Sequence, residues 1–205
     1  MFDRIIKMFI AALLVVVPLA GAAKDYVVKS PSGNLVLKVA TGKNLTWQGN
    51  FKGHEITAPS VLSVKLKNGG EWGSDNPGGK QGKVSRTIDG VNYRKAKIED
   101  KYTLLMLKGK GYSVEFRAYD DAAAYRFIAN ASDSVTIENE KVEYNFTKDY
   151  EAYVPYVNDL RHGERYSNSF EAYYDIQKIS QMRPQNLALV PFVVKLDGGI
   201  KAALT

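Results

Sequence analysis

The chain has 205 residues, contains no cysteine and carries a formal net charge of +6 at pH 7. The lack of cysteine excludes thiol catalysis and cysteine-ligated metal sites, and in an exported chain it favours a bacterial protein over an animal one. Lys and Arg alternate with Asp and Glu along the sequence without forming a basic stripe. We therefore interpret the charge as a solvated surface and do not predict nucleic acid as a partner.

Residues 1–23 have the order of a secretory signal peptide: a short basic segment, an apolar run and then small residues. The apolar run, residues 8–20, is shorter than the roughly 20 residues that span a bilayer. We expect cleavage near Ala22 or Ala23, which leaves a mature chain of 24–205 with no membrane span. The expected location is secreted, in the periplasm.

The mature chain shows a period-two apolar pattern, which is typical of short antiparallel strands. Turn signals rich in Gly, Asn and Asp separate the strands, and the only helical pattern is one or two turns at 174–182. Many short strands without alternating helices predict an all-β fold, a single large antiparallel β-sandwich. The predicted strands are 26–28, 34–40, 62–66, 91–98, 102–108, 112–119, 124–128, 135–137, 142–146 and 187–196, with a short one after Gly198-Gly199.

Two irregular stretches interrupt this pattern, and such segments on a β scaffold often form binding sites. Residues 68–83 are glycine-dense around Trp72, which is either a stacking platform for a sugar or a hydrophobic anchor of the loop. Residues 150–170 are dense in Tyr, Asn, Asp and Arg. Aromatic faces stack on sugar rings while Arg and carboxylates hydrogen-bond hydroxyls, so this segment suits carbohydrate. The alternative is that its tyrosines pack a sandwich edge.

Few residues suit catalysis. The two histidines, His54 and His162, are far apart in the sequence and lack metal-ligand spacing. No nucleophile elbow and no phosphate-binding loop occurs. Asp120 and Asp121 are adjacent, which is typical of a turn and not of a catalytic carboxylate pair. These residues therefore do not predict a histidine-ligated zinc site, and the segment from Tyr150 to Tyr174 is the better candidate for a functional site.

Six segments of the mature chain occur in a distinctive order. They are SPSGNLVLKV (30–39), LTWQGNFKGHEITAPSVLSVKL (45–66), GYSVEFRAYDDAAAYRFI (111–128), EKVEYNF (140–146), VPYVNDLRHGERYSNSFEAYYDIQKIS (154–180) and NLALVPFVVKLDGGIKAALT (186–205). In this order they resemble the N-terminal domain of glycoside hydrolase family 97. The third segment resembles the family's most distinctive block, although Ala122 stands where the family commonly has Gly.

The resemblance implies a β-super-sandwich of the galactose mutarotase type, which packs on a catalytic (β/α)8 barrel that follows it. Family members are exported, calcium-dependent exo-acting α-glucosidases or α-galactosidases, and the barrel supplies the catalytic carboxylates and most calcium ligands. A further calcium ligand is the Glu of a Thr-Glu-Ala-Asp-Leu motif, in which Thr205 would be the threonine. The expected partners are an oligosaccharide and the chain's own barrel, and we expect the chain alone to be inactive.

The candidate substrate-binding residues are Arg161, Glu171 and Tyr174. Glu171 and Tyr174 belong to a segment that resembles the family's Tyr-Glu-x-x-Tyr, and Arg161 lies in the same Tyr- and Arg-rich stretch. Two alternatives stay open. A stand-alone periplasmic carbohydrate-binding protein would itself bind oligosaccharides. A mutarotase-like sugar epimerase would need His54 and His162 to converge with a carboxylate in one cleft.

Overall fold

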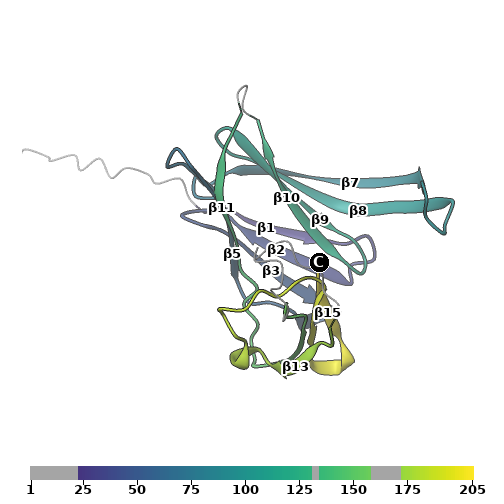
Figure 1. The fold of residues 1–205 in the computed structure, drawn as a ribbon. Helices are drawn as coiled ribbons and strands as arrows, with labels where there is room; N and C mark the ends of the chain where they lie inside the picture. Colours follow the sequence, from purple (N-terminus) through teal and green to yellow (C-terminus); the bar gives the residue numbers. More distant parts are fainter. Residues whose placement is uncertain (1–22, 131–133, 158–171) are drawn as a thin grey trace, which may run out of the picture.

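The computed structural model describes residues 23–130, 134–157 and 172–205, so the predicted signal peptide lies almost wholly outside the described residues. Antiparallel strands in three sheets build this part of the chain (Figure 1). Its helical content is two 3-10 turns, η1 (Ile179–Gln181) and η2 (Asp197–Gly199). In these three ranges no helix has the length and apolarity needed to cross a membrane. The predicted all-β fold is confirmed.

The largest sheet, sheet A, has the strand order β1-β2-β3-β5-β11, with β4 added to β3 and β6 added to β5. Alternate residues of β2 are buried, as the period-two pattern predicts, because successive side chains of a strand point to opposite faces. The strands of sheet A are β1 (Asp25–Lys29), β2 (Leu35–Ala40), β3 (Leu45–Phe51), β4 (His54–Glu55), β5 (Ser60–Leu66), β6 (Glu71–Trp72) and β11 (Ile137–Val142).

Sheet B packs face to face on sheet A and has the order β10-β9-β8-β7. Its inner face is apolar: Leu105 and Leu107 of β8 and Val114 of β9 are fully buried and share one core with the strands of sheet A. This pair of sheets is the predicted sandwich. The strands of sheet B are β7 (Gly78–Asp89), β8 (Lys97–Lys108), β9 (Tyr112–Ala118) and β10 (Ala123–Ala129).

Trp72 lies in the core of this sandwich. Its ring stacks on the ring of Tyr112, with centroids 5.4 Å apart and planes at 15°, and only 6% of its surface is exposed. The Tyr112 hydroxyl accepts a hydrogen bond from the Gly73 backbone N–H at 2.8 Å and donates one to Asp75. Trp72 therefore anchors the glycine-dense segment, and the interpretation of Trp72 as a sugar-stacking platform is wrong.

Sheet C is smaller and has the order β13-β12-β14-β15. Its own core is centred on Ala152, Val154 and Val194, which are fully buried, and Ile56 and Phe146 from the segments beside sheet A pack against it. The third sheet is thus joined to the sandwich by apolar contacts. Its strands are β12 (Glu151–Val154), β13 (Asp175–Lys178), β14 (Phe192–Lys195) and β15 (Lys201–Leu204).

Several predicted boundaries are wrong, and the errors cluster where strands are exposed. The predicted strands 91–98 and 102–108 are replaced by the single strand β8, and residues 84–89, for which we predicted no strand, form the outer half of β7. Because β7 is an edge strand exposed along most of its length, it needs no apolar alternation. The predicted strands 135–137 and 142–146 are likewise replaced by β11, which lies between them.

Other errors concern polar segments that form strands. Residues 78–83, expected to be a loop, are the first half of β7, and 45–51, for which no strand was predicted, form β3. Residues 151–154, expected to be irregular, form β12, and 175–178, expected to be helical, form β13. In each case pairing with neighbouring strands satisfies the backbone and outweighs the local pattern.

We predict that Trp72→Ala lowers the free energy of unfolding by about 3–5 kcal/mol, because it removes a large buried ring that the surrounding sheets cannot replace. Chemical denaturation followed by circular dichroism measures the change. Tyr93→Ala is the matched control, since Tyr93 is exposed and its truncation should change stability by no more than about 0.5 kcal/mol. A loss below about 1 kcal/mol at Trp72 would contradict its role as the anchor.

Candidate functional site at one end of the third sheet

The strand pairing of sheet C brings four strand ends together. Val154, the last residue of β12, lies opposite Asp175, the first of β13. Phe192, the first residue of β14, lies opposite Leu204, the last of β15. Since β12 also pairs with β14, all four residues lie at one end of the sheet. We call this the exit end, because the chain leaves it after β12 and returns to it before β13.

Two residues that are distant in the sequence, Tyr174 and Thr205, both lie at the exit end. Tyr174 directly precedes β13 and retains 36% exposure, and Thr205 directly follows β15. The structure therefore brings a candidate substrate-binding residue and the predicted calcium-motif threonine to the same end of one sheet. The other two candidates, Arg161 and Glu171, belong to the connection between β12 and β13 and lie outside the described residues.

A polar cluster that the sequence did not predict supports this end. The Tyr156 hydroxyl is buried and accepts hydrogen bonds from the Arg183 backbone N–H at 2.8 Å and from Gln177 Nε2 at 3.0 Å. The Arg183 guanidinium lies 4.0 Å from the centroid of the Tyr156 ring and pairs with Asp175. No local motif joins these residues, so only the fold reveals them. The cluster holds the start of β13 in place, and Tyr174 with it.

Exposed apolar side chains surround the exit end. Tyr173 is 95% exposed, and Ile176 of β13 and Val190, just before β14, are also exposed. Apolar groups that gather on a surface beside polar ones are typical of a contact face for another domain or a ligand. The exit end therefore combines an apolar rim with a hydrogen-bonding cluster.

The remaining candidates for chemistry lie elsewhere. His54 lies against η2, where a Cβ added at Gly198 would be 3.1 Å from His54 Cε1. Because η2 connects β14 to β15, His54 is at the end of sheet C opposite the exit end. His162 lies outside the described residues. Asp120 Oδ1 accepts a hydrogen bond from the Ser32 backbone N–H at 2.7 Å, which confirms its structural role.

The most buried carboxylate of the described residues is also structural. Glu115 of β9 pairs with Arg126 Nη2 at 2.7 Å and with Arg117 Nε. Burial alone would raise the pKa of Glu115, but the hydrogen bonds from the two guanidinium groups outweigh it and hold the pKa below its usual value. A carboxylate kept ionised in this way cannot serve as a general acid near neutral pH.

The described residues do not form a calcium site of their own. Residues 23–130, 134–157 and 172–205 contain no group of three His, Cys, Asp or Glu side chains that could hold a metal ion. At the exit end the nearest carboxylate, Asp175, is engaged by Arg183. Calcium needs six to eight oxygen ligands, which is more than the Asp175 carboxylate could supply.

The family profile described as Glycosyl-hydrolase 97 N-terminal matches residues 28–205. The chain belongs to this family. A curated relative, the retaining alpha-galactosidase of Bacteroides thetaiotaomicron, is 34% identical over 190 residues, which is 90% of this chain and 29% of that protein. The family 97 chain therefore spans less than a third of the length of this relative.

Solved structures agree with the fold. A glycoside hydrolase family 97 enzyme from Pseudoalteromonas sp. strain K8, in complex with panose, matches with a TM-score of 0.68 at 18% identity, over 86% of this chain and 27% of that one. A family 97 enzyme of the same strain in complex with acarbose gives the same values. A beta-arabinopyranosidase matches with a TM-score of 0.71 at 19% identity, over 84% and 30%. At these identities the likeness is one of fold.

We predict that Glu115→Gln lowers the free energy of unfolding by about 3 kcal/mol at neutral pH, because two guanidinium groups lose their buried anion. Since the pKa of Glu115 is lowered in the folded state, its ionised form stabilises the protein fully above the ordinary value of 4.5. That contribution is lost as the pH falls below this value. Urea denaturation at a series of pH values should show that the free energies of unfolding of the wild type and of Glu115→Gln become equal in acid.

Glu138→Gln is the control for this experiment. Glu138 pairs with Lys65 at 3.1 Å, but both side chains are about half exposed, so the change should cost no more than about 0.5 kcal/mol. If the gap between wild type and Glu115→Gln stayed constant from neutral to acid pH, Glu115 would not be ionised in the folded protein.

Proposed function

We propose that the chain is the N-terminal domain of an exported, calcium-dependent exo-α-glycosidase that acts on oligosaccharides, either as an α-galactosidase or as an α-glucosidase. The observation that carries this proposal is the family match over residues 28–205, together with the 34% identity to a retaining alpha-galactosidase of which this chain covers 29%. In such an enzyme the catalytic carboxylates would lie in a barrel formed by residues outside this chain.

The described residues suit a scaffolding role. Their most buried carboxylate, Glu115, is neutralised by two arginines, and they contain no cluster able to hold a metal. What they offer is the exit end, where Tyr173, Ile176 and Val190 are exposed. Burying these side chains against the barrel would remove apolar surface from water and stabilise the pair of domains.

The exit end would also set the position of the sugar. Tyr174 directly precedes Asp175, which pairs with Arg183 of the cluster, and Arg161 and Glu171 are the other proposed substrate-binding residues. An aromatic ring, a guanidinium and a carboxylate together can stack on and hydrogen-bond a sugar. Calcium would be held by the barrel and by the residue expected after Thr205, which β15 would deliver to the domain interface.

We predict that the chain of residues 24–205 alone does not hydrolyse p-nitrophenyl α-galactoside or α-glucoside, whereas the protein with its following barrel hydrolyses at least one of them. The reason is that the paired carboxylates of a glycosidase would be supplied by the barrel. Release of p-nitrophenol measures the activity. Hydrolysis by the chain alone would contradict the proposal. Oligosaccharide binding by the chain alone, with no activity in the longer protein, would favour a stand-alone binding protein.

A further inference from the structure

The outer halves of β7 and β8 project beyond sheet B. β8 pairs with β9 only from Thr103 to Lys108, whereas its pairing with β7 continues until Asp89 lies opposite Lys97. Residues 84–102 therefore form a two-stranded ribbon, which we call the arm. Its base still contacts the body of the molecule, since the Tyr119 hydroxyl donates a hydrogen bond to Asp100 at 3.1 Å, and Figure 1 shows its outer part extending away. Its tip, residues 90–96, is closed by a hydrogen bond from the Gly90 N–H to the Ala96 carbonyl at 3.0 Å.

Ion pairs along the arm leave its tip positively charged. Each of the three carboxylates of the arm is paired with a cation of the same ribbon. The pairs are Arg86 with Asp100 at 2.7 Å, Lys101 with Glu99 at 2.9 Å, and Lys97 with Asp89. The two remaining cations of the arm, Arg94 and Lys95, have no carboxylate partner among the described residues, and both lie in the tip.

The same tip exposes apolar side chains. Val91 is 83% exposed and Tyr93 is 59% exposed, and Ile88 is exposed at the end of β7. Asn92, between the first two, has φ +54°, a left-handed conformation that Asn tolerates better than most residues. An aliphatic group, a tyrosine and two unpaired cations thus share one small projecting surface. Tyr, apolar side chains and Lys or Arg in this combination are typical of groups that enter the interface of a membrane.

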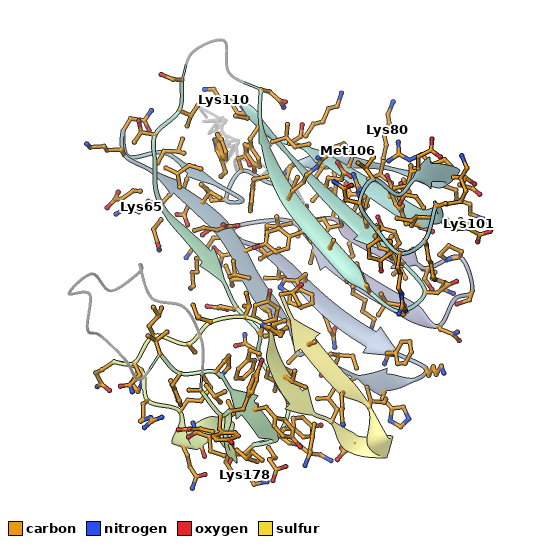
Figure 2. All side chains as sticks on the ribbon, turned by 45° about the vertical axis from the view of Figure 1, so that its right-hand side comes forward. Lys65, Lys80, Lys101, Met106, Lys110 and Lys178 are labelled. Carbon is orange, nitrogen blue, oxygen red and sulfur yellow. The ribbon has the colours of Figure 1, made fainter. Side chains whose placement is uncertain are left out.

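The net positive charge of residues 24–205 is concentrated on β7, β8 and the turn between them, of which the arm itself holds five Lys and Arg against three Asp and Glu. Residues 78–108 carry eight Lys and Arg against three Asp and Glu, whereas the other residues after 23 carry eighteen of each. The interpretation of the charge as evenly spread is therefore wrong. Figure 2 shows Lys80 of β7 and Lys101 of β8 away from Lys65 and Lys178.

We propose that the tip docks the protein on an anionic lipid bilayer. Val91 and Tyr93 enter the headgroup region, and Arg94 and Lys95 pair with the lipid phosphates. A projecting tip can meet a flat surface that the body of the molecule cannot approach. A second copy of the chain is a poorer partner, because outside residues 78–108 its charges cancel and offer no net acidic complement. This inference rests on the arm alone and is independent of the proposed glycosidase function.

The test is sedimentation of the protein without residues 1–23 with lipid vesicles. The leader is omitted because its apolar run would itself bind lipid, and the first strand begins only at Asp25. We expect binding to vesicles of phosphatidylglycerol and phosphatidylcholine to be at least tenfold tighter than binding to phosphatidylcholine alone. High salt should weaken it, because exposed charges are screened. Tyr93→Trp should show a blue shift of its emission on binding.

Two double variants separate the parts of the proposal. Arg94→Glu with Lys95→Glu, and Val91→Ser with Tyr93→Ser, should each weaken binding at least tenfold. Lys43→Glu with Lys67→Glu, which changes two exposed lysines outside the arm, is the control for charge and should alter binding less than twofold.

Three results would overturn the proposal. The first is no binding to anionic vesicles at low salt, in which case an acidic protein would be the better partner for the tip. The second is that the Lys43 and Lys67 changes weaken vesicle binding as much as the Arg94 and Lys95 changes do, which would show that the whole positive surface, and not the tip, attracts the vesicles. The third is unchanged binding after Val91 and Tyr93 are replaced, which would show that the apolar tip does not enter the bilayer.

Discussion

The arrangement of the exit end depends on one strand, β12, which pairs on both sides within sheet C. Two of its four residues, Ala152 and Val154, are fully buried in the core of that sheet. Because β13 and β14 are both antiparallel to β12, and β15 is antiparallel to β14, the pairing fixes the exit end. A one-residue slip in β12 would turn its buried residues to the opposite face of the sheet and displace Tyr174 and the end of β15 from each other.

The sandwich of sheets A and B supports the exit end and does not form part of it. Its core, with Trp72 stacked on Tyr112, is apolar and closed, and its buried carboxylate Glu115 is held by arginines. The sandwich is a rigid base from which sheet C offers its exit end and β7 and β8 extend the arm. This division of roles is consistent with the proposed packing of the domain on a separate catalytic barrel.

The fold class could be predicted because buried strands such as β2 and β9 carry an apolar pattern that is a property of the sequence alone. The exposed strand β7 could not be predicted in this way, because an edge strand needs no alternating apolar pattern. Tyr174 could be named as a candidate because it lies within a single sequence segment, and its role in substrate binding stays a prediction. The cluster of Tyr156, Gln177 and Arg183 was not, because strand pairing alone brings these residues together. The arm was missed because charge was judged over the whole chain.

We propose that the exit end is the face on which a catalytic barrel packs. The chain contains no natural cysteine, so Tyr173→Cys places a single thiol at this end, and Ile137→Cys places one on sheet A as a control. Maleimide labelling of each peptide, followed by mass spectrometry, compares the chain alone with the protein that includes the barrel. The account predicts that the barrel slows labelling at residue 173 at least tenfold and leaves residue 137 unchanged. Equal labelling at residue 173 in both proteins would contradict it.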